Sequence, residues 1–344
     1  MKRKENAQAY LVMNNKKLTI DDIALALGIS KTTVSRAISG KGRISQATRN
    51  KVKEFIEINN YKPNIIAKSL AQSKTYNIAV LIPSDCNISE LPFFQNCMYG
   101  VCEAAASRDY DVLVIYTSGN ETDNLERVII NNKIDGVVVT RTVVDDNVVK
   151  LLKRHNLPFV TIGSTNDPEV IRIDHDHRSA CCQLTRLLIR QGIQKIALIG
   201  GNNTHMVTLN RYQGFLDAFR LEKLEPNKDN IYLNVENTST IDDITENLLK
   251  KDVECILCMD DVICSKVLYK LQKEHVDVPD RIKLASFYNS MLLANQTPSI
   301  TTLDFDVKTL GVTSCNILLD VINSQEVETK TYLDYKIFEL DSTK

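Results

Sequence analysis

The sequence predicts an all-α headpiece at the N-terminus, followed by a larger, two-lobed α/β body with parallel sheets. Two observations lead to this prediction. Residues 1–77 contain 15 Lys and Arg against 5 Asp and Glu, a net charge of +10. Because the whole chain has 42 Lys and Arg and 43 Asp and Glu, residues 78–344 contain 27 basic against 38 acidic residues, a net charge of −11. Residues 18–70 have the spacing of short helices, whereas short apolar runs alternate with helix-period segments from Asn77 onward.

The first two helices of the headpiece have clear start and stop signals. Thr19, with Asp22 three residues later, is an N-cap signature, and Gly28 ends this first helix. Ser30 caps the second helix. The short break between the two helices predicts a helix-turn-helix unit.

The second helix has one apolar face and one polar face. Val34 and Ile38 form an apolar i, i+4 pair, and the opposite face presents Lys31, Thr32, Ser35 and Arg36. A basic, patterned unit of this kind attracts the phosphate backbone of double-stranded DNA, whereas the acidic remainder is repelled by it. The alternative is a solvated basic tail, which the helical pattern disfavours.

The body alternates predicted strands with predicted helices, which is typical of parallel sheets covered by helices. The chain contains nine short apolar runs, which are 77–84, 111–119, 135–141, 158–164, 170–176, 195–201, 255–261, 282–290 and 299–306. Nine strands are more than we expect in one sheet, so we expect two lobes. Helical periodicity is found at 94–108, 124–131, 146–155, 179–191, 211–221, 241–250 and 262–275.

These patterns divide the chain into four parts, which are a polar extension (1–16), a headpiece (17–62), a hinge helix with linker (63–76) and the body (77–344). Within the body, one lobe is expected at 77–173 and 304–330, and the other at 174–303 and 331–344. The tail TYLDYKIFELDSTK has the pattern of a strand and lacks a leucine heptad, which favours a dimer without a tetramerising coiled coil.

No segment has the pattern of a signal peptide or of a membrane span, so we expect a cytoplasmic protein. The odd number of cysteines, nine, fits reduced and mostly buried thiols better than a disulfide framework.

A ligand site is expected in a cleft between the lobes, because ligands of open parallel sheets bind beyond the carboxyl ends of the strands. Arg211 follows the strand KIALIGG and can fork two hydrogen bonds onto hydroxyls or a carboxylate. Asp260 ends the strand CILCMDD and can accept hydroxyl hydrogen bonds. Arg141 is a weaker candidate, with an exposed surface charge as the alternative.

Two other patterns resemble metal or redox sites, and neither is expected to be one. Asp174, His175, Asp176 and His177 offer four metal ligands, but consecutive side chains at a strand end point in different directions, so a loop that caps the next helix is the simpler interpretation. Cys255 and Cys258 have redox or zinc spacing but lie in an apolar strand without a second pair. No cofactor is predicted.

The motifs together resemble a known family across residues 17–340. VSRAISG, the NY-x-PN turn at 60–64, AKSLA and the first strand NIAV occur in the order and spacing of the lac repressor and galactose repressor family of transcriptional regulators. The segments VTLNRYQGF, CMDD, RIDHD and SFYNSMLLANQTPSITTLDF are most similar to regulators of maltose and maltodextrin operons. The resemblance implies a body like the periplasmic binding proteins.

The resemblance also implies how the chain meets DNA. The first, second and sixth positions of the recognition helix reach base edges in this family, which here means Lys31, Thr32 and Arg36. The residues expected to hold phosphates or the backbone, in the headpiece and in the hinge, are Thr19, Ser30, Thr33, Ser35, Thr48, Asn50, Asn64, Ala67 and Lys68. Leu70 stands where family members insert a leucine into the minor groove, with a plain core position as the alternative. Lys68 replaces the commoner arginine.

For the effector, the resemblance implies a sugar held by Arg211 and Asp260, with Phe94, Tyr288 and Asn289 completing the site and Arg141 as a weaker member. Phe93 and Phe94 can stack on a sugar ring or lie in the core. Tyr288 replaces the acidic residue of many sugar-responsive members.

The predicted function is a homodimeric repressor, not an enzyme, that a maltose-like sugar releases from its operator. The main alternative is a catabolite-control regulator whose DNA binding a phosphorylated protein or metabolite enhances. A sugar-binding receptor fits less well, because it would leave the headpiece unexplained. A sugar-modifying enzyme also fits less well, because Asp260 and Asp261 are adjacent in sequence and do not by themselves make an acid and base pair.

Overall fold

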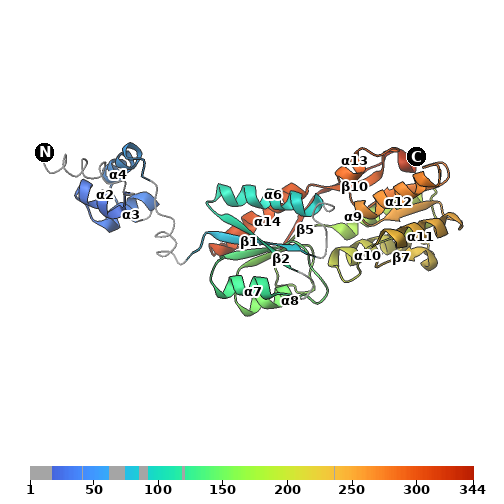
Figure 1. The fold of residues 1–344 in the computed structure, drawn as a ribbon, viewed down its shortest axis with the longest axis horizontal. Coiled ribbons are helices and arrows are strands. Elements are labelled where there is room, and N and C mark those ends of the chain that lie inside the picture. The colour runs from blue at the N-terminus through green and yellow to red at the C-terminus, as the bar shows by residue number, and fades with distance from the viewer. Residues whose placement is uncertain (1–17, 41, 62–73, 85–91, 118–120, 236) are drawn as a thin grey trace. The chain divides into compact units, whose positions relative to one another are not determined.

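A computed structural model describes residues 18–40, 42–61, 74–84, 92–117, 121–235 and 237–344. The chain forms two compact units, Met1–Lys74 and Thr75–Lys344 (Figure 1).

The described residues of the first unit form the helices α2 (Ile20–Leu27), α3 (Lys31–Ser39) and α4 (Gln46–Ile58). The predicted caps are confirmed. Thr19 and Asp22 form a capping box, Gly28 ends α2 in the left-handed conformation at φ 66°, and the side chain of Ser30 accepts the Thr33 N–H at the start of α3. The helices enclose a small core whose buried members are Ile23, Ala24, Val34, Val52 and Tyr61.

In the second unit, the first lobe is built on a six-stranded sheet in the order β11-β5-β4-β3-β1-β2, in which all neighbouring strands are parallel. Its strands are β1 (Asn77–Pro83), β2 (Asp111–Thr117), β3 (Gly136–Val139), β4 (Phe159–Ile162), β5 (Arg172–His175) and β11 (Lys330–Leu333). Helices α6 (Pro92–Ser107) and α14 (Val307–Ile322) lie on one face of the sheet, and α7 (Asp123–Ile130) and α8 (Asn147–Arg154) on the other (Figure 1). Alternate residues of β1 therefore enter two different cores.

The second lobe repeats this plan with the order β12-β10-β9-β8-β6-β7. Its strands are β6 (Ile196–Ile199), β7 (Ile231–Tyr232), β8 (Cys255–Cys258), β9 (Lys283–Ser286), β10 (Thr301–Phe305) and β12 (Tyr335–Phe338), and only the pair β10–β12 is antiparallel among the described strands. Its helices are α9 (His177–Arg190), α10 (Met206–Leu221), α11 (Thr238–Leu249), α12 (Asp261–Lys273) and α13 (Met291–Ala294). Among the described residues, no helix is both long and apolar enough to span a bilayer.

The chain passes between the lobes three times, at Asp176, Asp306 and Asp334. The predicted lobe boundaries at 174, 304 and 331 were therefore slightly early, because each strand completes its pairing in one sheet before the chain leaves it. The predicted C-terminal strand is two strands, β11 and β12, which belong to different sheets.

Each lobe has a close helix pair. In the first lobe, a Cβ added at Gly311 of α14 would lie 2.1 Å from the Cys97 carbonyl oxygen of α6, and one at Gly100 of α6 would lie 2.1 Å from the Lys308 carbonyl oxygen. In the second lobe, a Cβ at Gly214 of α10 would lie 2.3 Å from the Arg178 carbonyl oxygen of α9. The backbones of these helices are therefore in direct contact, which only glycine permits.

Candidate functional site

The exposed face of α3 is polar and basic, as predicted. Lys31, Thr32, Ser35 and Arg36 are exposed, while Val34 on the opposite face is fully buried. Lys31 forms an ion pair with Asp21 of α2. Helix α3 thus presents hydrogen-bond donors on its exposed face.

Several predicted phosphate-binding hydroxyls also serve as helix caps. Ser30 bonds the hydroxyl of Thr33, and Thr48 bonds the hydroxyl of Ser45 at the start of α4. The hydroxyl of Thr19 donates to Asp22, and Asn50 accepts from Gln46. These contacts fix the helix starts. The four predicted hinge contacts, Asn64, Ala67, Lys68 and Leu70, lie outside the described residues.

In the second unit, Arg211 lies on α10 and is only 9% exposed. Its Nη1 donates to the Met259 carbonyl oxygen at the end of β8, and its guanidinium carbon lies 5.8 Å from the ring centroid of Tyr288. The Nε atom is buried and has no hydrogen-bond partner among the described residues. Arg211 therefore retains donor capacity for an acceptor beside an aromatic ring.

Tyr288 is buried within an aromatic cluster. Its ring centroid lies 6.2 Å from that of Phe93 and 6.3 Å from that of Phe305, onto which it stacks. Phe94, the predicted ring, is only 7% exposed and packs in the core, whereas Phe93 beside it contacts Tyr288. Phe94 therefore has the core position that the sequence analysis left open, and Phe93 is the ring that lies beside Tyr288.

The carboxylates near Arg211 are also buried to different degrees. Asp260 is half-buried and caps α12 by accepting the Ile263 N–H at 2.8 Å; burial raises its pKa, while that hydrogen bond and Arg211 oppose the change. Asp261 is 2% exposed and accepts the Ser290 hydroxyl, and burial raises its pKa to about 6. Asn289 donates to Asp304 at 3.3 Å.

The two lobes touch beside the start of α10. The Val144 N–H donates to the Thr204 carbonyl at 2.9 Å, and the Met206 N–H donates to the Thr142 carbonyl at 3.1 Å. The side chain of Asn210 donates to the hydroxyl of Ser164. A backbone bridge thus connects loops of both sheets at the carboxyl ends of their strands.

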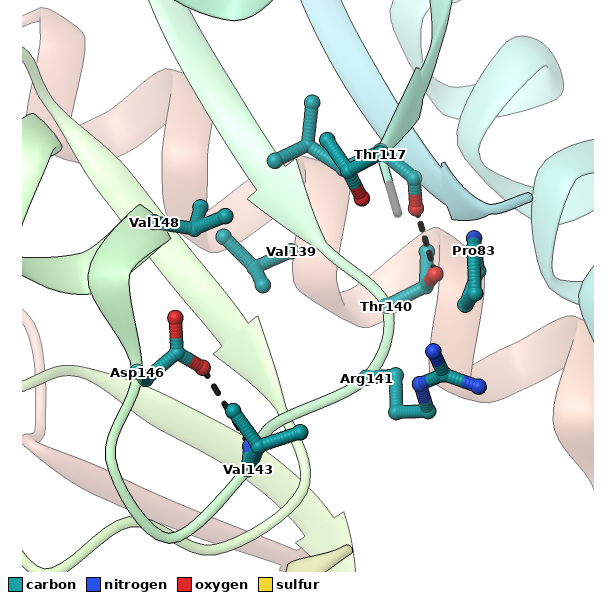
Figure 2. A pocket seen from close by; sticks show the side chains of 9 residues that line it. Pro83, Thr117, Val139, Thr140, Arg141, Val143, Asp146 and Val148 are labelled. Atoms are coloured by element: carbon teal, nitrogen blue, oxygen red, sulfur yellow. Dashed lines mark hydrogen bonds between the residues drawn. The ribbon is translucent and has the colours of Figure 1, made fainter. Parts of the chain in front are cut away.

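Arg141 lies in a small pocket on the first lobe. It is half-buried rather than exposed, and the pocket is formed where β1, β2 and β3 end. Figure 2 shows Arg141 beside Pro83, with Asp146 accepting the Val143 N–H at 3.3 Å on the other side. This edge, where the chain winds to either side of β1, is where open parallel sheets bind ligands.

Contrary to the expectation from the sequence, the side chains of residues 174–177 do not all point apart. Asp174, His175 and His177 converge, and one ligand atom of each lies within 4.8 Å of those of the other two. The side chains converge because the backbone changes from strand β5 to helix α9 between the two histidines. Only Asp176 behaves as expected, since it caps α9 by accepting the Ser179 N–H at 3.0 Å.

The cysteines agree with the prediction of buried thiols. Cys255 and Cys258 are fully buried in β8, and burial raises the pKa of both thiols. All eight described cysteines are free thiols, and among these only Cys102 is exposed.

An exposed basic helix on a helix-turn-helix unit, joined to a two-lobed α/β unit with polar groups at its strand ends, defines a ligand-responsive DNA-binding regulator. Two family models match the chain. Residues 19–64 match the bacterial regulatory proteins of the lacI family, and residues 75–334 match the periplasmic binding proteins and sugar-binding domain of the LacI family. The chain therefore belongs to the LacI family of bacterial transcriptional regulators, which are not enzymes.

Similar proteins include other regulators. The HTH-type transcriptional regulator MalR of Streptococcus pneumoniae serotype 4 is 28% identical over 316 residues, which are 90% of this chain and 94% of that protein. Catabolite control protein A of Staphylococcus epidermidis is 25% identical over 321 residues, with the same coverage of both chains. The solved structure of the lac repressor dimer bound to operator and the anti-inducer ONPF is also similar. The two chains have a TM-score of 0.75 and 20% sequence identity, and the match covers 95% of this chain and 99% of that one.

Proposed function

We propose that this protein is a homodimeric repressor of a carbohydrate-utilisation operon, and that a maltose-like or maltodextrin-like sugar bound between its lobes releases it from DNA. The observation that carries this proposal is Arg211, a buried guanidinium beside the Tyr288 ring whose Nε has no partner in the described part of the chain. Such a pair suits a sugar, because the guanidinium binds hydroxyl oxygens and an aromatic ring covers the apolar face of a pyranose.

The partner residues follow from the same arrangement. Asp260 and Asn289 supply acceptors and donors for hydroxyls, Phe93 extends the aromatic surface of Tyr288, and Arg141 stands at the strand ends of the other lobe. Similarity to MalR regulators, one of which is described as a probable maltose operon transcriptional repressor, supports the choice of maltose-like sugars.

A dimer is supported by apolar side chains at the edge of the first lobe. Val114 and Tyr116 on the edge strand β2 are 42% and 49% exposed, and Tyr99 on the adjoining α6 is 63% exposed. Exposed apolar residues beside a free strand edge are typical of a surface that another chain covers. A dimer would place two recognition helices on a two-fold symmetric operator.

In this mechanism, sugar binding favours one arrangement of the two lobes and thereby changes how the subunits hold their headpieces. The DNA affinity then falls by the difference in free energy with which the sugar binds the two states. The segment 63–76, which joins the headpiece to the body, transmits the change.

The proposal is tested by fluorescence anisotropy with the DNA upstream of the protein's own gene, at fixed salt, with maltose, longer maltodextrins and an unrelated sugar. Release by maltose or maltodextrin alone is expected. Salt is held constant because phosphate contacts weaken steeply as it rises. Specific binding that none of these sugars weakens would contradict the proposed effector. Binding strengthened by a phosphorylated metabolite or protein would favour the catabolite-control alternative instead.

Arg36 is expected to read a base. Replacing it with alanine should weaken operator binding by about 1–3 kcal/mol, the value of one good base contact, with a smaller loss on an unrelated duplex. Lys53→Ala on α4, an exposed lysine paired with Glu57, is the control and should affect both duplexes alike. Competition binding with the two duplexes measures both. Equal losses for Arg36→Ala on operator and unrelated DNA would assign Arg36 to the phosphate backbone instead.

A further inference from the structure

The three passages between the lobes meet in one aromatic cluster, whose members are buried except for the half-buried Tyr335. Phe305, at the end of β10, lies 4.8 Å from the His175 ring and 4.7 Å from the His177 ring, measured between centroids. Tyr335, at the start of β12, lies 6.2 Å from Phe305. This cluster, made of His175, His177, Phe305 and Tyr335, therefore contains a residue from each passage.

The two histidines lie there with unused nitrogen atoms. His175 is 1% exposed and His177 is 7% exposed, and His175 Nε2 and His177 Nδ1 have no hydrogen-bond partner among the described residues. A buried imidazole nitrogen without a partner is costly, and such a group in a native fold is usually explained by a function or by a bound ligand.

Asp174 completes a set of metal-binding atoms. It is 4% exposed, and its Oδ1 lies 3.5 Å from His177 Nε2 and accepts the His175 N–H at 2.8 Å. One ligand atom from each of the three residues lies within 4.8 Å of the others. Ligands that bind zinc at about 2.1 Å cannot be more than about 4.2 Å apart, so a small adjustment of side chains would bring all three onto one ion.

Charged groups of both signs act on the three residues. Asp176, Asp306 and Asp334, the residues at the three passages, act electrostatically on Asp174 or His175. Arg211 opposes them, since its guanidinium acts on both Asp174 and His177.

We propose that Asp174, His175 and His177 form a binding site for a divalent transition-metal ion, with zinc as the representative ion, at the hinge between the lobes. Two imidazoles and a carboxylate are a ligand set that zinc and its neighbours accept. The ion would connect the end of β5 in one lobe to the start of α9 in the other. It would thereby restrain the passage around which the lobes change their arrangement.

The test uses the full-length protein, first treated with a chelator and dialysed, without DNA or sugar, so that the outcome does not depend on the proposed effector. Zn²⁺ is titrated by calorimetry, and Co²⁺ serves as the spectroscopic probe. One ion per chain is expected, with a Co²⁺ spectrum of nitrogen and oxygen ligands. Asp174→Asn and His177→Gln should each weaken binding by more than about tenfold.

Two matched variants serve as controls. Asp176→Asn changes the neighbouring carboxylate, keeps the cap of α9 and should retain the ion. His155→Gln changes the histidine at the C-cap of α8 and should also retain the ion. Circular dichroism and thermal unfolding of the metal-free variants show whether each one folds. Absence of binding, equal affinity in Asp174→Asn, or an intense thiolate band in the Co²⁺ spectrum would overturn the proposal, the last by assigning the ion to cysteine.

Discussion

Arg211→Lys is expected to abolish the response to sugar while leaving operator binding without sugar within about twofold of the parent protein. Lysine keeps the charge but cannot reproduce the planar fork with which the guanidinium contacts the Met259 carbonyl and faces Tyr288. Loss of one partner of a buried, charged hydrogen bond costs about 2–5 kcal/mol, which corresponds to more than about thirtyfold in sugar affinity.

The measurement is calorimetric titration with the effector sugar, paired with the anisotropy assay on operator DNA. Arg220→Lys is the matched control, because Arg220 lies on the same helix, is exposed and pairs with Asp217 at 2.8 Å; it should behave like the parent. Thermal unfolding checks that the Arg211 variant is folded. A folded Arg211→Lys protein that still releases DNA at the same sugar concentration would place the effector elsewhere.

Gly311→Ala is expected to destabilise the first lobe strongly, by more than about 2 kcal/mol. The added methyl group would meet the Cys97 carbonyl at 2.1 Å, so α14 must move away from α6. Overpacking of this kind lowers the free energy of unfolding by about 1–3 kcal/mol, and by more where the contact is with backbone atoms. This loss exceeds the roughly 1 kcal/mol by which alanine stabilises a helix relative to glycine. The buried neighbours Leu310 and Cys315 would lose their packing.

Urea unfolding followed by circular dichroism measures this loss as a lower midpoint. Gly201→Ala is the control, because a Cβ at Gly201 has no atom within 4 Å and the residue has no positive φ. Its midpoint should stay close to that of the parent. Should Gly311→Ala unfold at the parent midpoint, the close contact of α6 with α14 would not be a determinant of stability.

The headpiece was determined largely by local sequence. Thr19, Asp22, Gly28 and Ser30 act on backbone groups within a few residues, so their caps could be predicted without knowledge of the fold. The same holds for the face of α3, because helical periodicity alone separates Val34 from Arg36. The nine apolar runs likewise became strands, since short buried runs between helical segments have few other structures available.

Helix α14 was not predicted, and the reason is physical. Its sequence contains Gly311 and several β-branched residues, which lower the intrinsic preference for a helix. Its stability comes from burial against α6 and the sheet, where Gly311 permits a contact that local sequence cannot reveal. Tertiary packing also assigned β11 and β12 to different sheets, because alternation within a strand says nothing of its neighbours.

What the sequence by itself determined about this protein is therefore its local structure, its family and the chemistry of its exposed basic helix. Only the tertiary structure decided which side chains meet. It placed Phe93 rather than Phe94 against Tyr288, and it brought Asp174, His175 and His177 together where a strand becomes a helix. The physical reason is that caps and periodicity depend on a few neighbouring residues, whereas convergence depends on backbone directions fixed by long-range packing.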